Sequence, residues 1–310
     1  IFFTFHEFLT ICHNHGQMLK SGGTKLCNRA SPIECNGCFP DISPASFLRR
    51  ERFIKSMLEL ADHYVSPSEF LAKRFVDWGM KAEKMSVIEN GLDIDERAKD
   101  RQLSKTQPRR SRFAFFGQLT MFKGADILLD AVGRVPDEIW GDDARLMIFG
   151  GNLERQPPEY QEKVHDLIEK AGDRVRFYGA YQNTEMPKLM ELADWTIIPS
   201  IWWENSPVVI QEAFFHGRPM ICSNIGGMAE KITNGVNGLH FRVGSAEDLA
   251  DRLIDVLSDN KIWDRMREGI PRVTTYEECA EQHLAQYREV LKTRLLSAKA
   301  ATEQNVASTA

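Results

Sequence analysis

Two acidic residues are spaced around the start of an expected helix. The stretch Trp202–Pro219 reads WWENSPVVIQEAFFHGRP, and seven residues separate Glu204 from Glu212. Pro207 is typical of the first turn of a helix, and Gly217 of the position just after its end. We therefore expect Glu204 in the loop before the helix, and Glu212 about a turn and a half inside it, roughly 8 Å along the axis from its start at ~1.5 Å per residue.

Such a helix start suits a ligand that carries both phosphates and hydroxyls. Free backbone N–H groups make the N-terminus of a helix attractive to anions, and Ser206 or Asn205 can cap this one. Acids at the two ends of an anionic ligand most naturally accept hydrogen bonds from hydroxyls. A nucleotide-sugar fits this description, with one acid for the sugar and one for the ribose. On spacing alone, two solvated acids on a surface helix are an equally good interpretation.

A second candidate for phosphate binding is GQLTMFKG, residues 117–124, which follows the apolar run RFAFF. Gly117 lets the backbone approach a ligand, and Lys123 precedes an expected helix, a combination that suits a phosphate. The stretch matches neither a Walker A motif nor G-x-G-x-x-G, so a turn with a surface lysine is equally plausible. Gly150 and Gly151 follow the next apolar run, where turn formation or an open crevice would explain them.

The elements that must position these residues alternate regularly between expected strands and expected helices. Between residues 113 and 258, short apolar runs alternate with helical patterns. This alternation predicts a Rossmann-like domain, with a parallel sheet covered by helices on both faces. Ligands of such sheets bind beyond the carboxyl ends of the strands, where all the residues named above are expected.

Residues 1–92 hold fewer regular elements, and the chain opens with Ile inside a strand-like run. We interpret them as the C-terminal part of a first Rossmann-like domain whose N-terminal part is missing. The further expected divisions are a charged surface linker at 93–112, the second domain at 113–282, a C-terminal helix at 283–297 and a disordered tail at 298–310. Four basic residues of the linker could bind phosphate, although a solvated linker is favoured: Lys105, Arg109, Arg110 and Arg112.

The charge and the apolar run lengths argue against a nucleic-acid-binding protein and against a membrane-spanning helix. A net charge of −5 and a pI near 6.0 argue against nucleic-acid binding through a basic surface. No apolar run reaches the roughly 20 residues that a membrane-spanning helix needs. Four of the six cysteines lie close to the N-terminus, and the opening run IFFTF is not expected to be a secretion signal. Metal ligands are therefore favoured over disulfides or reduced thiols for Cys12, Cys27, Cys35 and Cys38.

Several stretches together resemble the family 4 retaining glycosyltransferases of the GT-B fold, over about residues 1–290. Glu204 and Glu212 match the E-x7-E signature of that family. The other matching stretches are FFGQLTMFKGADILLDAV for the phosphate-binding segment, SVIENGLD for the end of the first domain, and TFHEFLTICHNHGQM for the segment carrying the active-site histidine, here His6.

The resemblance implies an α/β, GT-B protein with an acceptor domain followed by a nucleotide-sugar donor domain. Such an enzyme moves a sugar from a UDP- or GDP-sugar to a hydroxyl of a glycan or lipid-linked acceptor. By carry-over, Glu212 holds the ribose, Glu204 contacts the transferred sugar, Lys123 neutralises the diphosphate, and His6 faces the sugar. The implied donor-binding set is Gly117, Gln118, Lys123, Gly150, Asn205, Ser206, Pro207, Val208 and Glu212. Many relatives have arginine at the position of Gln118. Because glutamine carries no charge, we expect weaker stabilisation of the diphosphate leaving group here.

The resemblance also sets expectations for cofactors and location. A branch of the family carries a similar Cys-rich insertion, so Cys12, Cys27, Cys35 and Cys38 are expected to hold one structural zinc, with His13 or His15 as a substitute ligand. No cofactor is expected for catalysis. A cytoplasmic protein of polysaccharide or glycolipid biosynthesis is implied, with peripheral contact at the inner membrane face as an option. A non-catalytic nucleotide-sugar binding module and a nucleotide-sugar epimerase remain as alternatives.

Overall fold

The computed structural model describes the backbone of residues 1–93 and 96–308, and the side chains of 1–93 and 96–296. The chain forms two compact units. The first comprises Ile1–Gly16, Arg29–Asp93 and Thr274–Ala310, and the second comprises Gln17–Asn28 and Ile94–Val273.

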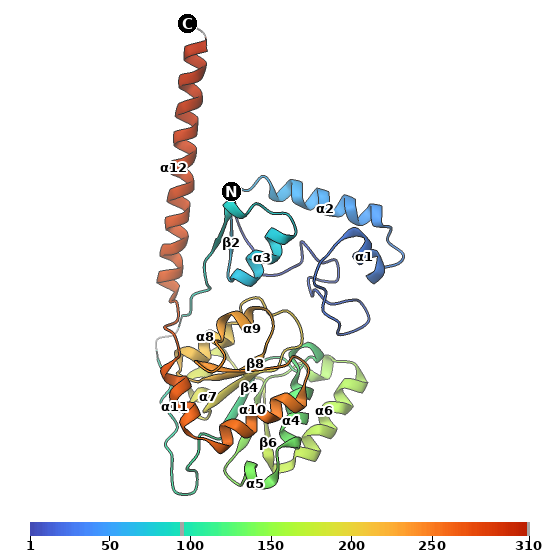
Figure 1. The fold of residues 1–310 in the computed structure, drawn as a ribbon, viewed down its shortest axis with the longest axis vertical. Helices are drawn as coiled ribbons and strands as arrows, with labels where there is room; N and C mark the ends of the chain where they lie inside the picture. The colour runs from blue at the N-terminus through green and yellow to red at the C-terminus, as the bar shows by residue number, and fades with distance from the viewer. Residues whose placement is uncertain (94–95, 309–310) are drawn as a thin grey trace. The chain divides into compact units, whose positions relative to one another are not determined.

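The second unit is built on one parallel sheet (Figure 1). Its strands are β4 (Arg112–Phe116), β5 (Arg145–Phe149), β6 (Val175–Gly179), β7 (Trp195–Ile198), β8 (Met220–Ser223) and β9 (Gly238–Phe241). They lie in the order β6-β5-β4-β7-β8-β9, and every pairing is parallel. This is the doubly wound order of a Rossmann fold, as the alternating pattern predicted.

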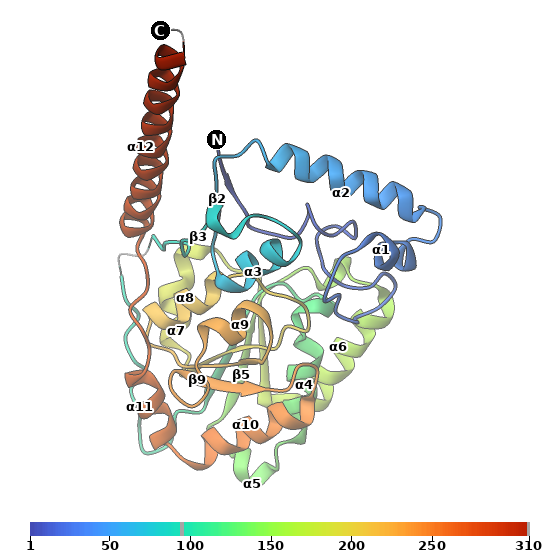
Figure 2. The ribbon, with the colours of Figure 1, turned by 45° about the horizontal axis from the view of Figure 1, so that its top comes forward.

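Helices cover both faces of this sheet (Figure 2). One face carries α4 (Ala125–Arg134), α5 (Asp137–Trp140), α6 (Pro158–Ala171), α10 (Ala246–Ser258) and α11 (Lys261–Glu268). The other carries α7 (Met186–Glu191), α8 (Val208–Phe215) and α9 (Gly226–Lys231). Successive strand residues point to opposite faces, so Phe113 and Phe115 join the first core while Ala114 and Phe116 join the second. Burial on both sides explains why the strands are continuously apolar.

The first unit contains a smaller parallel sheet, in the order β1 (Phe2–Thr4), β2 (His63–Ser66) and β3 (Met85–Val87). Its helices are α1 (Pro32–Cys38), α2 (Pro44–Leu58), α3 (Glu69–Asp77) and α12 (Tyr276–Ser308). The side chains of Ser31, Ser43 and Ser68 cap the first three helices by accepting a backbone N–H. Two of the four N-terminal cysteines, Cys35 and Cys38, lie on α1.

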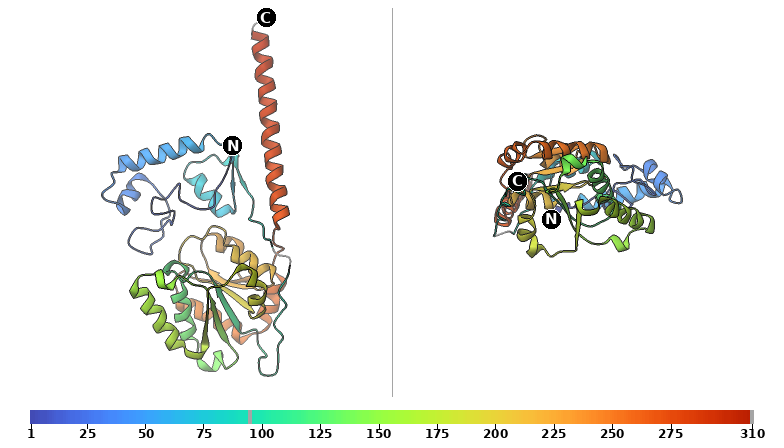
Figure 3. Two further views of the ribbon diagram at one scale, coloured as in Figure 1. Left: turned by 180° about the vertical axis from the view of Figure 1, so that it is seen from behind. Right: turned by 90° about the horizontal axis from the view of Figure 1, so that it is seen from below.

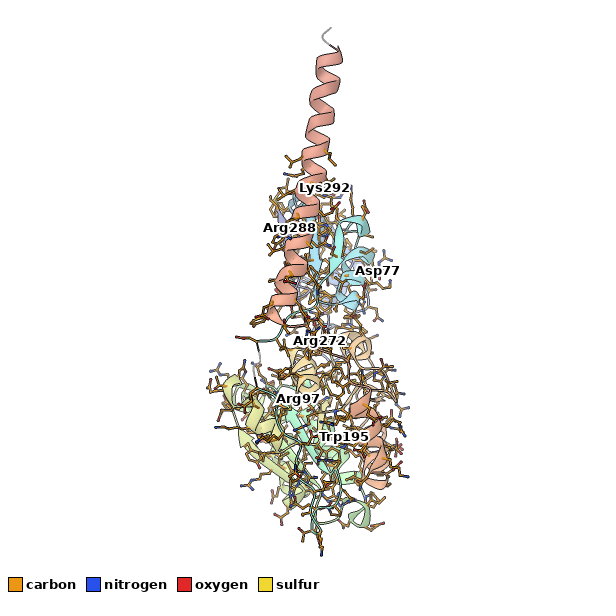
Figure 4. The ribbon with its side chains drawn as sticks, turned by 90° about the vertical axis from the view of Figure 1, so that its left-hand side faces the viewer. Asp77, Arg97, Trp195, Arg272, Arg288 and Lys292 are labelled. Carbon is orange, nitrogen blue, oxygen red and sulfur yellow. The ribbon has the colours of Figure 1, made fainter. Side chains whose placement is uncertain are left out.

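The C-terminal boundary differs from the prediction. Residues 276–308 form one continuous helix (Figure 3), so the predicted C-terminal helix at 283–297 is present with wider bounds, and residues 298–308 are helical instead of disordered; residues 309–310 lie outside the described residues. This helix belongs to the first unit, where the Leu92 N–H donates to the carbonyl of Thr274 over 3.0 Å and the Phe2 and Tyr287 rings meet edge to face. The second domain therefore ends near residue 273. Arg288 and Lys292 mark the course of α12 in Figure 4.

Part of the predicted linker packs against the second unit, although residues 102–106 are exposed. Asp194 is 1% exposed and accepts hydrogen bonds from the guanidinium groups of Arg101 and Arg110. Arg109 pairs with Asp143 and also donates to backbone carbonyls. These contacts occupy two of the four basic residues that had been considered for phosphate binding, Arg109 and Arg110. Residues 94 and 95 of the predicted linker lie outside the described residues.

In the described chain, no helix combines the length and apolar character needed to cross a bilayer.

Candidate active site

The site lies where the strand order of the second unit reverses. β4 and β7 are neighbours, and the helices that follow them, α4 and α8, pack on opposite faces of the sheet. In open α/β sheets, ligands bind at such a reversal of strand order, beyond the carboxyl ends of the two strands. The candidate residues Gly117 and Lys123 follow β4, and Glu204 follows β7.

Three hydrogen bonds converge on Glu204. The Lys123 ammonium donates to Oε1 over 2.6 Å, and the Ser200 hydroxyl donates to the same oxygen over 2.8 Å. The indole N–H of Trp202 is the third donor, at 2.9 Å. Glu204 is only 8% exposed, so the interpretation as a solvated surface acid is wrong. A buried carboxylate is retained because these donors replace its lost hydration.

The two loops that carry this ion pair pack closely together. The rings of Phe122 and Trp202 stack with their centroids 5.5 Å apart and an interplanar angle of 14°. The Ile201 N–H also donates to the carbonyl of Phe122 over 2.9 Å. Gly124 has φ +70°, and a Cβ there would lie 2.0 Å from the carbonyl oxygen of Pro199. Only glycine therefore permits this approach between the segment after β4 and the loop after β7.

The start of α8 differs from the expectation in one detail. Pro207 is the N-cap residue and Val208 the first helical residue, and no side chain caps this helix. Neither Asn205 nor Ser206 therefore has the predicted capping role. Within the described residues, the Ser206 hydroxyl is buried without a hydrogen-bond partner. A buried hydroxyl beside uncapped N–H groups is suited to a polar ligand at this helix start.

Glu212 occupies a different environment from Glu204. It lies half-buried on α8, and burial raises the pKa of its carboxyl group. Tyr181, which follows β6, has its pKa raised to about 12, first by burial and then by the charge of Glu212. Its ring meets Phe116 edge to face, 5.7 Å between centroids. Sequence reasoning missed Tyr181, although an aromatic residue just beyond the carboxyl end of a strand was a usable signal.

Glycines at the strand ends are explained by close packing. A Cβ on Gly150 would lie 1.8 Å from the carbonyl oxygen of Gly117. The backbone N–H of Gly117 donates to the carbonyl of Phe149 over 3.0 Å, and the backbone N–H of Gly150 donates to the carbonyl of Gly179 over 2.7 Å. These glycines let neighbouring strand ends approach one another. Gln118, which follows Gly117, is exposed.

α9 supports the acidic loop from its other side. The N–H of Gly227 donates to the carbonyl of Glu204 over 2.7 Å. A Cβ on Gly227 would lie 2.0 Å from the carbonyl oxygen of Asn205. The backbone of the E-x7-E loop is therefore fixed by the element that follows β8, a contact that no sequence pattern had indicated.

The remaining predicted residues belong to the N-terminal part of the chain. His6 is exposed, shortly after β1 in the first unit. Cys12 and Cys27 are buried, whereas Cys35 and Cys38 are half-buried. Across the described residues, no three His, Cys, Asp or Glu side chains form a group that could hold a metal ion. The structural zinc stays a prediction, which metal analysis of the purified chain would decide.

The strand order and a site at the switch point are those of the Rossmann-like domains in GT-B proteins. Residues 96–272 match the family Glycosyl transferases group 1, and residues 9–96 match Glycosyltransferase Family 4. Because the first match covers more than half of the 310 residues, the chain belongs to the group 1 glycosyl transferases.

Individual proteins and solved structures are also similar to this chain. An uncharacterized 41.2 kDa protein in the cps region of Klebsiella pneumoniae is 26% identical over 243 residues, which are 75% of this chain and 62% of that protein. The D-inositol 3-phosphate glycosyltransferase of Corynebacterium glutamicum is 28% identical over 197 residues, 60% of this chain and 46% of that enzyme. The crystal structure of Anabaena HepE in complex with UDP and glucose gives a TM-score of 0.66 at 21% identity, covering 93% of this chain and 71% of HepE. The chain thus spans about half the length of the curated relatives it matches.

Proposed function

We propose that the second unit binds a nucleoside-diphosphate sugar, and that the whole protein transfers the sugar to an acceptor hydroxyl with retention of configuration. The observation that carries this proposal is the Lys123–Glu204 pair, a buried acid and a cation 2.6 Å apart at the switch point of the sheet. A cation suits the diphosphate and an acid suits sugar hydroxyls. HepE, which has the same fold, has been crystallised with UDP-glucose.

In this proposal each residue acts on a different part of the donor. Glu212 accepts a hydrogen bond from a ribose hydroxyl, and Glu204 accepts one from the transferred sugar. The N–H groups at the start of α8 and the Ser206 hydroxyl donate to the diphosphate or the sugar. Lys123 has three N–H donors, so its pair with Glu204 leaves it able to donate to phosphate oxygens.

The chemical step breaks the bond between the sugar C1 and the β-phosphate oxygen, and forms a bond from C1 to the acceptor oxygen. The leaving nucleoside diphosphate takes up the electron pair of the broken bond, and the acceptor hydroxyl gives its proton to the departing β-phosphate oxygen. Negative charge therefore develops on the phosphate, where Lys123 and the helix terminus stabilise it. By resemblance to the family, His6 faces the sugar, and the acceptor is a glycan or a lipid-linked sugar.

The test is donor binding to the 310-residue chain, measured by calorimetry with UDP, GDP, UDP-glucose and GDP-mannose. We expect K123A to weaken nucleoside-diphosphate binding about 10- to 100-fold, the range for a lost hydrogen bond between charged groups. K188A removes an exposed lysine from α7 of the same unit and should bind like the wild type. Equal affinities of K123A and wild type would remove Lys123 from the site.

A second candidate function is a nucleotide-sugar binding module without transfer. It is favoured by Gln118, which is exposed and uncharged at a position where the family pattern often has arginine. Release of nucleoside diphosphate from the donor by the full-length protein would support the transferase. Tight donor binding without any such release would support the binding module.

A further inference from the structure

We infer that Trp202 is a positioning residue that orients Glu204 toward the transferred sugar. This inference rests on the proposed function, because it assigns a direction to the acid that contacts the sugar. It concerns a residue that neither the E-x7-E spacing nor the phosphate-binding segment includes.

The hydrogen bonds to Glu204 are distributed unevenly over its two oxygens. Lys123, Ser200 and Trp202 all donate to Oε1, at 2.6, 2.8 and 2.9 Å. Within the described part of the chain, no hydrogen bond to Oε2 accompanies them. A carboxylate accepts through both oxygens, so the protein fixes one of them and leaves the lone pairs of the other for a ligand hydroxyl. Three donors on one atom also set the orientation of the carboxylate plane before the donor sugar arrives.

Trp202 contributes more to this arrangement than one hydrogen bond. Its indole ring stacks on Phe122, and the Lys123 ammonium lies 5.6 Å from the ring centroid, within reach of a cation–π attraction. The ring therefore touches both members of the ion pair through different parts: its N–H meets the acid, and its face meets the cation. Trp202 lies in the loop after β7, whereas Phe122 and Lys123 lie after β4, so one side chain connects the segments that follow the two strands.

The neighbouring tryptophan provides a matched control. The indole N–H of Trp203 donates to the carbonyl of Cys27 over 3.2 Å instead of to the acid. W202F and W203F thus make the same chemical change one residue apart. Both keep an aromatic ring and remove an N–H, but only W202F removes a donor from Glu204.

The experiment compares each variant with the wild type for two ligands, UDP and UDP-glucose, with GDP and GDP-mannose as the second pair. W202F should weaken binding of the nucleotide-sugar about tenfold, the effect expected for one hydrogen bond to a charged group. Its affinity for the nucleotide alone should change less than twofold, because Glu204 does not touch the nucleotide. W203F should match the wild type for both ligands.

Each outcome decides the matter. If W202F weakened the binding of UDP and UDP-glucose equally, the role of Trp202 would be merely structural and the inference would be overturned. Wild-type affinity of W202F for both ligands would also overturn it. An equal effect of W203F on the nucleotide-sugar would overturn it too, since the specific donor would then be unimportant. If the wild type binds no nucleotide-sugar, the proposed function falls and takes this inference with it; a normal wild type with an unaffected W202F removes only the inference.

Discussion

Glu204 and Glu212 belong to one motif, but the structure places them in opposite electrostatic environments. Glu204 is buried against a lysine, a hydroxyl and an indole N–H, which together stabilise its charge. Glu212 is half-buried, and burial raises the pKa of its carboxyl group. At the residue scale, the two acids are therefore specialised: hydrogen bonds hold the first in place, and burial raises the pKa of the second.

The raised pKa of Glu212 predicts a pH dependence of donor binding. An ionised Glu212 is the better acceptor for a ribose hydroxyl, so affinity for UDP-glucose should fall as the pH drops through the raised pKa. UDP-glucose is the suitable probe because its diphosphate, esterified at both ends, does not titrate near neutral pH as the terminal phosphate of UDP does. Calorimetry across pH 5–8 should show this fall for the wild type and a flatter profile for E212Q.

The same residue predicts the pH dependence of stability. Because the folded pKa is raised, folding takes up a proton between the unfolded and folded pKa values, and the free energy of unfolding falls as the pH rises through that window. E212Q should lack this decrease, while E162Q, on the exposed face of α6, should keep it. Identical denaturation profiles for the wild type and E212Q over this range would contradict the assignment.

At the scale of elements, the site depends on how closely the segments after β4 and β7 approach. Gly124 combines a positive φ of +70° with a position where a Cβ would lie 2.0 Å from the Pro199 carbonyl oxygen. The adjacent Lys123 and the Phe122–Trp202 stack depend on the same approach. A change at Gly124 should therefore disturb both the fold and the ion pair.

We predict that G124A loses stability and nucleotide affinity together. G244A is the matched control, because Gly244 has φ +77° and, among the described residues other than its chain neighbours, no atom lies within 4 Å of the added Cβ. That control should lose only the roughly 1–2 kcal/mol of left-handed backbone strain and keep its nucleotide affinity. G124A should lose more, as measured by denaturant unfolding and calorimetry. Equal losses in the two variants would show that the contact with Pro199 is unimportant.

At the scale of the whole molecule, the units are assembled from segments that are distant in sequence. The first unit takes in α12, and the second takes in both Gln17–Asn28 and the packed segment that begins at residue 96. Asp194 connects that segment to the sheet, because its carboxylate accepts hydrogen bonds from the guanidinium groups of Arg101 and Arg110 and from the backbone N–H of Arg112. Trp195, labelled in Figure 4, adds an indole hydrogen bond to the carbonyl of Arg110 over 2.9 Å.

This assembly predicts that fragments with different N-terminal boundaries differ in stability. A fragment of residues 96–273 keeps the partners of Asp194, whereas one of residues 113–273 leaves that acid, 1% exposed in the chain, without its arginines. Removing one partner of a buried ion pair lowers the free energy of unfolding by about 3–5 kcal/mol. Urea unfolding should show a loss of this size for the shorter fragment.

An exposed ion pair supplies the control for the fragments. D130A in residues 96–273 removes the exposed pair with Arg134 and should cost less than about 1 kcal/mol. Two fragments of equal stability would mean that the contacts of residues 96–112 add nothing to the donor unit.

The sequence by itself determined the class of the second domain and the residues at the ends of its strands. Strand and helix periodicities, proline and glycine positions, and apolar runs are local signals, so they located the sheet, the E-x7-E acids and the segment ending at Lys123. Only the tertiary structure decided that Lys123 meets Glu204, since the two are 81 positions apart. Likewise, only tertiary contacts turned Trp202 toward the acid, buried Asp194 under the predicted linker, and placed α12 in the first unit. Such contacts depend on packing between distant segments, which no local pattern of residues encodes.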